Sequence, residues 1–313
     1  MSSPALAPRA NRRSARPSSL RRQQAIEGYL CLLPWLIGFV CFTAVPMLGS
    51  LALSLTKWEM ISSPQWVGLA NFTHIAIDPL FFQSLYNTAY ISFISVPLGL
   101  TIALLIALGL NERLRGVSFY RTFFFLPSQM PLVAGALVWL WVLNPDFGLA
   151  NQALHIVGVK PLHWLFDVNL VKPSLITITL WNGVGVPMLI FLAGLQGVPE
   201  SLYEAASIDG ADTLERFRHI TVPMISPVIF FNLIIGIIAS FQANFTLVYI
   251  TTQGGPANAS LIYVLYLYFK AFQDFEMGYA SALAWILLLI VAALTAFQFF
   301  LARRWVYYEG GDR

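Results

Sequence analysis

The sequence is poor in charged residues and in cysteine. Asp, Glu, Lys and Arg make up 11% of its 313 residues and hydrophobic residues 58%, whereas a soluble domain carries roughly a quarter charged residues. This deficit excludes an ordinary soluble domain and indicates an integral membrane protein. The two cysteines, Cys31 and Cys41, lie in one apolar segment, which excludes a disulfide framework.

Charged residues are missing altogether from six long segments. Each is long enough to cross a hydrocarbon core about 30 Å thick as a helix, and continuous apolar runs favour helices over barrel strands. Prolines such as Pro127, Pro131 and Pro187 predict kinks or broken turns in them. We therefore predict an all-α integral membrane protein with six transmembrane helices, at residues 29–55, 84–110, 122–143, 174–197, 224–250 and 277–301.

The stretches between these segments differ in their content of Lys and Arg. Fourteen of the 18 Lys and Arg residues lie in residues 1–28 or in every second stretch between or after the apolar segments. The remaining stretches hold the other four, Lys57, Lys160, Lys172 and Lys270. By the positive-inside rule, this asymmetry places both termini and residues 198–223 in the cytoplasm. The basic tail, residues 1–28, is then an orientation signal on a disordered segment, and no nucleic-acid partner is expected.

Two of the opposite, outer stretches have sequences that predict local order. Residues 62–83 mix aromatic and aliphatic residues with polar positions, which predicts a short helix at the membrane surface. Residues 251–256 read Thr-Thr-Gln-Gly-Gly-Pro, which predicts a tight polar turn.

The six apolar segments also lack groups that couple transport to energy. They contain no carboxylate, lysine, arginine or histidine, which argues against proton coupling and less strongly against sodium coupling through backbone carbonyls. The sequence has no Walker A pattern, no metal-ligand cluster and no nucleophile–base set at usable spacing. We therefore predict that the chain is not an enzyme, with no catalytic or metal-binding residues, and that its energy comes from another subunit.

The longest polar stretch between two apolar segments is Glu200–Pro223, and it predicts two short helices. Ser201 and Glu204 fit a capping box for the first helix, and Gly210 fits a left-handed cap at its end. Asp212 and Glu215 can cap the second helix. On this pattern alone, the stretch could be only a well-capped connection between two spans.

The spacing of certain residues in this stretch resembles a known signature. Glu204-Ala205-Ala206, then Gly210, then Ile220 and Val222-Pro223 resemble the EAA motif of ABC importer permeases, with Val222 where the family pattern has leucine. In that family the loop forms a coupling helix that docks into a groove on the ATP-hydrolysing subunit. The resemblance implies ATPase-coupling roles for Glu204, Ala205, Ala206, Asp209, Gly210 and Ala211.

The resemblance covers nearly the whole chain, about residues 29–305. Residues 67–72, 144–148, 192–196, 254–256 and 278–282 are similar to the carbohydrate-type permeases of maltose, multiple-sugar and glycerol-phosphate importers. It implies a type I ABC importer permease fold, with a permease domain at 29–305 that contains a coupling loop at 198–223, and cytoplasmic tails at 1–28 and 306–313.

The same resemblance implies where the chain works and with which partners. The implied location is the bacterial plasma (inner) membrane, where the chain would be a multi-pass protein in the lipid bilayer. The implied partners are a second homologous permease subunit in a heterodimer, a dimer of ABC ATPases and an extracytoplasmic solute-binding protein. No cofactor is expected on this chain, because ATP and Mg would be bound by the ATPase partner.

A neutral sugar would need hydrogen-bonding groups and aromatic faces along its route. The candidate pathway residues are Asn182, Gly183, Ser240, Phe241, Gln242 and Asn244, and similarity to the maltose-type subunit implies sugar contacts for Gly183 and Asn244 by identity. The alternative is that such residues tie the spans together through hydrogen bonds. The sequence thus predicts a permease subunit for a sugar or sugar-like solute, the alternative being a self-sufficient secondary carrier for a neutral solute.

Overall fold

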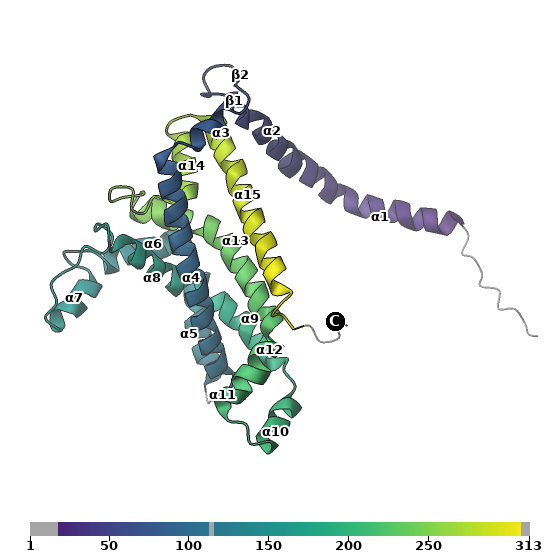
Figure 1. Ribbon diagram of the computed structural model, residues 1–313, viewed down its shortest axis with the longest axis vertical. Helices are drawn as coiled ribbons and strands as arrows, with labels where there is room; N and C mark the ends of the chain where they lie inside the picture. Colours follow the sequence, from purple (N-terminus) through teal and green to yellow (C-terminus); the bar gives the residue numbers. More distant parts are fainter. Residues whose placement is uncertain (1–17, 113–115, 308–313) are drawn as a thin grey trace, which may run out of the picture. The chain divides into compact units, whose positions relative to one another are not determined.

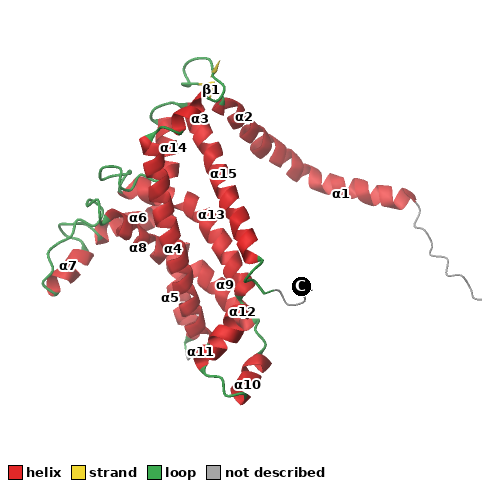
Figure 2. Ribbon diagram, viewed as in Figure 1, coloured by secondary structure: helices red, strands yellow, loops and turns green. Residues whose placement is uncertain are grey.

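The computed structural model describes residues 18–112 and 116–307, which are mostly helical (Figures 1 and 2). Most residues of the two predicted tails, 1–28 and 306–313, lie outside these ranges. Residues 18–28, which were predicted to be disordered, are helical. The elements are α1 (Ser18–Phe39), π-helix η1 (Val40–Ala44), α2 (Val45–Ser54), β1 (Thr56–Lys57), β2 (Gln65–Trp66), α3 (Ala70–Ile75), α4 (Pro79–Asn111), α5 (Val117–Gln129), α6 (Leu132–Val142), α7 (Leu149–Ile156), α8 (Val171–Gly183), α9 (Gly185–Gln196), α10 (Glu200–Ile208), α11 (Thr213–Arg216), π-helix η2 (Phe217–Thr221), α12 (Val222–Met224), α13 (Ser226–Thr251), α14 (Tyr263–Phe272) and α15 (Met277–Ala302).

The described helices contain four to six candidate membrane spans. Arg22–Ser54, α4, α13 and α15 are each long and apolar enough to cross a membrane alone. Two further spans are bent pairs of helices, α5 with α6 at 97° and α8 with α9 at 49°. The first break falls at Met130-Pro131 and the second at Val184, three residues before Pro187, so the predicted proline-associated breaks are present.

The helices exceed the predicted charge-free segments at several ends. Arg121 lies inside α5 and Lys172 lies in the first turn of α8. Helix α4 begins at Pro79, before the predicted residue 84, because the Asp78 side chain caps it by accepting a hydrogen bond from the backbone N–H of Leu80 at 2.9 Å. The apolar run therefore marks the interior of a span, and the cap marks its true start.

The chain divides into two compact units, Met1–Ala52 and Leu53–Arg313. In the first unit, most of the large apolar side chains from Ile26 to Leu51 are exposed. A helix that is apolar on every side requires apolar surroundings.

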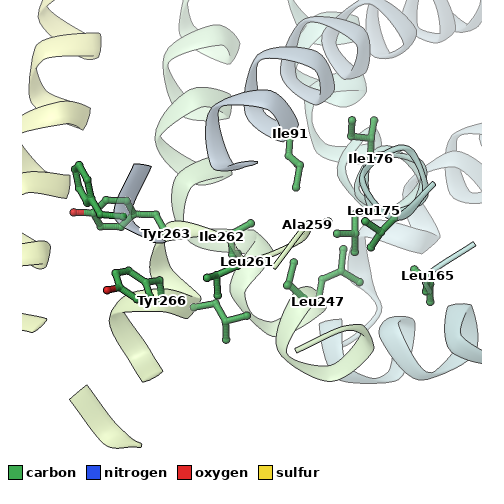
Figure 3. Packing of buried hydrophobic residues seen from close by; sticks show 14 of the residues in the cluster. Ile91, Leu165, Leu175, Ile176, Leu247, Ala259, Leu261, Ile262, Tyr263 and Tyr266 are labelled. Atoms are coloured by element: carbon green, nitrogen blue, oxygen red, sulfur yellow. The ribbon is translucent and has the colours of Figure 1, made fainter. Parts of the chain in front are cut away.

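The core of the second unit forms where α4, α8 and α13 meet the loop before α14. Ile91 of α4, Leu175 of α8 and Leu247 of α13 share one buried cluster with Leu261 of the loop and Tyr263 at the start of α14 (Figure 3). A second cluster joins α4 to α9 through Ala103, Ala107, Met188 and Phe191. Helix α4 therefore packs against helices from most of the sequence, and small residues on it allow close approach.

Polar side chains hold one end of the second unit together, around the start of α4. The Asp78 carboxylate accepts hydrogen bonds from the hydroxyls of Tyr266 on α14 and Tyr279 on α15, the latter at 2.6 Å. Burial raises the pKa of Asp78, but these donors and the backbone amides of Leu80 and Phe81 outweigh that effect and leave the pKa below its ordinary value. The ionised carboxylate thus ties three helices.

The sequence did not predict several elements at this end. The stretches predicted to lie on the outer side contain the antiparallel pair β1–β2, with Thr56 opposite Trp66, and the helix α14. The short helix predicted within residues 62–83 is present as α3, and its place at the membrane surface stays a prediction. Gly278 begins α15 beside β1, where a Cβ would collide with the carbonyl oxygen of Thr56, so this approach requires glycine.

We predict that Asn87→Ala destabilises the fold more than Gln83→Ala. The buried Asn87 amide donates to the carbonyls of Asn258 and Leu261 at 2.9 and 3.0 Å, whereas Gln83 donates to Asn258 from a more exposed position. Asn87→Ala removes the donor from the carbonyl of the buried Leu261, which costs about 1–3 kcal/mol, whereas the Asn258 carbonyl keeps one of its two donors in either variant. Thermal unfolding of the purified protein in detergent measures the difference, and equal shifts in both variants would contradict it.

Candidate functional site

The predicted polar loop lies at the end of the second unit opposite β1 and α3 (Figure 1). It consists of α10, a turn at residues 209–212, α11, η2 and α12, and it connects α9 to α13. Two helical arms joined by a turn are thus formed, as the sequence predicts.

The residues of this loop are presented to the surroundings. All residues of α10 and α11 are exposed or half-buried, and Glu204, Ala205, Asp209 and Gly210 are exposed. Ala206 and Ala211 are half-buried. The apolar side chain of Ile208 is 87% exposed, and Leu214 is also exposed. Large apolar side chains exposed on a polar loop form a surface that another protein can cover.

Gly210 forms the turn between the two arms. Its φ of +81° lies in the left-handed region, and the N–H of Ala211 donates to the Ala206 carbonyl at 2.9 Å. The predicted left-handed cap is therefore confirmed. An added Cβ would meet no atom within 4 Å, so a side chain at Gly210 would be penalised by backbone strain and not by collision.

The two predicted helix caps have different outcomes. The predicted cap by Asp212 and Glu215 is confirmed and is a capping box, with hydrogen bonds of 2.9 and 2.7 Å between each side chain and the other residue's backbone N–H. The box of Ser201 and Glu204 is wrong, because α10 begins earlier, with Pro199 at the N-cap position. Ser201 therefore lies inside the helix, and the exposed Glu204 carboxylate has no capping role.

Side-chain hydrogen bonds tie α10 to the second arm. The hydroxyls of Tyr203 and Thr221 lie 3.0 Å apart, and Arg216 donates from Nη1 to the Ser207 hydroxyl at 3.1 Å. Thr221 is buried at the base of the loop. A force applied to α10 can therefore reach the start of α13 through these contacts.

A second candidate site is a cavity of about 250 Å³ between α4, α8, α9 and α13. Three of the six predicted pathway residues, Gly183, Ser240 and Asn244, line it together with Thr179. The Thr179 hydroxyl donates to Asn244 Oδ1 at 3.1 Å, and Asn244 Nδ2 donates to the Ser240 carbonyl at 3.2 Å. The structure thus brings polar residues of α8 and α13 together in one cavity.

The other three predicted pathway residues lie elsewhere. Asn182 donates from Nδ2 to the Pro127 carbonyl at 2.8 Å and so ties α8 to the last turn of α5, near the break. Phe241 is buried in an apolar cluster with Val96 and Ile237. Gln242 is exposed and is not among the residues lining the cavity.

Two polar residues of this cavity, Ser95 on α4 and Asn232 on α13, were not predicted from the sequence. Both are only 4% exposed, and neither the Ser95 hydroxyl nor Asn232 Nδ2 has a hydrogen-bond partner in the described part of the chain. Leaving such a group unpaired costs about 1–3 kcal/mol. A spacing signal existed, because Asn232, Gly236, Ser240 and Asn244 recur every four residues and so share one helix face.

Comparisons with known proteins identify relatives along most of the chain. The "Probable ABC transporter permease protein YesP" of Bacillus subtilis is 42% identical over 93% of this chain and 95% of its own length. The lactose transport system permease LacF of Rhizobium radiobacter is 36% identical, covering 91% and 97%. The trehalose/maltose transport system permease MalF of Thermococcus litoralis is 34% identical, covering 89% and 94%.

Solved structures share the fold. A chain of a bacterial ABC transporter involved in the import of the acidic polysaccharide alginate matches with a TM-score of 0.80 at 24% identity, covering 91% of this chain and 97% of that one. A chain of the alginate transporter in complex with a pentasaccharide-bound periplasmic protein matches with the same TM-score at 23% identity, covering 91% and 96%.

The sequence model of one family matches residues 95–307, which is more than half of the chain. The matched residues include both the polar loop and the residues that line the cavity. The predicted resemblance and the multi-pass membrane location are confirmed. The chain belongs to the family described as "Binding-protein-dependent transport system inner membrane component", and it is a permease subunit of an ABC importer.

Proposed function

We propose that this chain carries a sugar or sugar-like solute inward as one of two homologous permease subunits, driven by ATP hydrolysis on separate ABC ATPase subunits. The observation that carries the proposal is the exposed polar loop of α10 and α11, which presents the family's signature residues at one end of an apolar bundle. The names of the relatives, which include permeases for lactose, trehalose/maltose and arabinooligosaccharides, support the solute class.

The proposed arrangement in the membrane has six spans with both termini in the cytoplasm, as in a type I importer. Counting each bent pair as one span gives six, and the excess of Lys and Arg in alternate stretches supports the orientation. The permease domain would extend over residues 29–305, with the basic tail 1–28 and the tail 306–313 in the cytoplasm. The Asp78 cluster then lies at the outer face and α10 at the inner face.

In this proposal α10 is the docking element for an ATPase subunit. Glu204 offers a charged contact, Ala205 and Ala206 allow close approach, and Ile208 offers apolar area. Asp209, Gly210 and Ala211 form the turn that sets the angle between the two arms. ATP and Mg²⁺ would be bound by the ATPase subunits, and closure of those subunits would move the loop and, through it, α9 and α13.

The cavity lined by Gly183, Ser240 and Asn244 would form one wall of the solute pathway. Its volume of about 250 Å³ is below the roughly 300–1,000 Å³ that encloses a small-molecule ligand. A second permease subunit would complete the pathway, and an extracytoplasmic binding protein would deliver the solute to it. The alginate transporter chain solved with a periplasmic protein supports such a partner.

Reconstitution tests the whole proposal. The chain would be placed in proteoliposomes with its partner permease, the ATPase and the binding protein, and uptake of radiolabelled sugars would be followed. We expect uptake that requires ATP and the ATPase subunits. Uptake by this chain alone, without ATP, would show a self-sufficient carrier and contradict the proposal.

We predict that Glu204→Lys reduces ATPase binding at least tenfold, because it places a cation where the proposed dock uses a carboxylate. Glu59→Lys is the matched control, since Glu59 is also exposed but lies beside β1, at the other end of the molecule. The measurement is the amount of ATPase that copurifies with each permease in detergent. Normal copurification with Glu204→Lys would count against the docking role.

We predict that Gly210→Val uncouples the loop while the chain still inserts into the membrane. A β-branched residue in the left-handed region is strained by roughly 1–2 kcal/mol, which is enough to open the turn. Gly158→Val is the control, because Gly158 has a similar φ of +78° but follows α7. ATP-driven uptake should fall only in Gly210→Val, and an equal loss in both variants would indicate a general effect on folding.

A further inference from the structure

One face of α13 carries a line of small and polar residues along the cavity. Asn232, Gly236, Ser240 and Asn244 follow one another at intervals of four residues, and all four line the cavity. Ser95 also lines this cavity, from α4, where a Cβ on Gly236 would lie only 3.0 Å from the neighbouring Val96 side chain. The polar lining therefore extends beyond the residues with a proposed role.

The two ends of this line differ in how their polar groups are paired. At one end, Asn244 bonds with Thr179 and with the Ser240 carbonyl, and the Ser240 hydroxyl donates to the Ile237 carbonyl at 2.8 Å. At the other end, Asn232 Nδ2 is buried without a hydrogen-bond partner among residues 18–112 and 116–307, and so is the hydroxyl of Ser95, which lines the cavity from α4. Buried polar groups are normally paired, so these two are suited to a ligand.

The chemistry of the lining selects the kind of ligand. The cavity is mostly apolar and, within the described ranges, its lining contains hydroxyl and amide groups but no charged side chain. An anionic group would be left without a counter-charge here, whereas the hydroxyls of a neutral sugar can both donate and accept.

We propose that Ser95 and Asn232 form a second solute-binding position, which takes hydroxyl groups of a neutral sugar on the cytoplasmic side of Asn244. This proposal rests on the proposed function and on its orientation. Asn232 precedes Asn244 by twelve residues, about 18 Å along a helix that rises 1.5 Å per residue. A sugar that leaves Asn244 would therefore meet Asn232 before it reaches the inner end of α13. The two residues would act as specificity-determining groups for the exit half of the route.

The test uses the complete complex of both permeases, the ATPase and the binding protein in proteoliposomes. The probes are radiolabelled lactose, maltose, trehalose and sn-glycerol 3-phosphate, and the wild type identifies which of them is imported. We expect import of that probe to fall about threefold to tenfold in Asn232→Leu and in Ser95→Ala, because each variant loses one hydrogen bond to the solute. The solute preference of the binding protein does not affect the ratio of variant to wild-type import, because the same binding protein is used in every assay.

Thermal stability separates a binding role from a structural one. If the Asn232 amide has no partner in the resting protein, Asn232→Leu should keep or raise the Tm of the complex while import falls, and Asn232→Gln should retain most of the import. Ser92→Ala is the matched control for Ser95→Ala, because both serines are on α4. Ser92 is 1% exposed and its hydroxyl is also unpaired in the described part of the chain, but Ser92 does not line the cavity. Its import should equal that of the wild type.

Each other outcome overturns the proposal. Unchanged import in both variants would show that the solute does not use these groups. A fall in import together with a lower Tm, or with loss of the partner permease on purification, would show that they support packing or assembly. If the wild-type complex imports sn-glycerol 3-phosphate but none of the three sugars, the neutral class is wrong. If uptake proceeds without ATP or without the ATPase subunits, the proposed function fails, and this proposal fails with it.

Discussion

The exclusion of water from the membrane interior is the constraint on which the rest of this structure depends. A polar group buried there is costly unless it finds a partner inside the protein or in a ligand, because lipid offers none. The long single helices α4, α13 and α15 accordingly carry no charged residue, and their few polar side chains cluster where helices meet. Charged side chains lie at both ends of the second unit, in the Asp78 cluster at one end and in the loop around Gly210 at the other.

The loop and the cavity are linked through the chain itself. The loop joins α9 to α13, and both helices line the cavity, α9 with Val186 and Pro187 and α13 with Ser240 and Asn244. Its two arms are fixed to each other by the bonds of Tyr203 with Thr221 and of Arg216 with Ser207. A displacement of α10 is therefore not absorbed inside the loop, and this connection gives a physical route from an ATPase subunit to the solute pathway.

The sequence predicted what depends on local pattern and missed what depends on distant contacts. The absence of charge predicted the long apolar helices, and the positive φ of Gly210 followed from its place after a short helix. The capping box at Ser201 was wrong because Pro199 starts the helix earlier. Helix α14 and the β1–β2 pair were missed, since α14 is positioned by bonds from Asn87 and Thr88 on α4, about 175 residues away along the chain. Asn182 and Phe241 could not be separated from Asn244 by type, because only the packing shows which of them line the cavity.

Docking of the ATPase on α10 is the central claim, and cross-linking tests it most directly. With Cys31 and Cys41 replaced by serine, Ile208→Cys and Ile156→Cys would each carry one cysteine at a position that is 87% or 86% exposed, on α10 and α7 respectively. In the assembled complex, a thiol–amine cross-linker of about 10 Å should join Ile208→Cys to the ATPase, and more strongly with bound ATP, while Ile156→Cys should give no such product. Equal products from both positions, or none from Ile208→Cys in an active complex, would contradict the account.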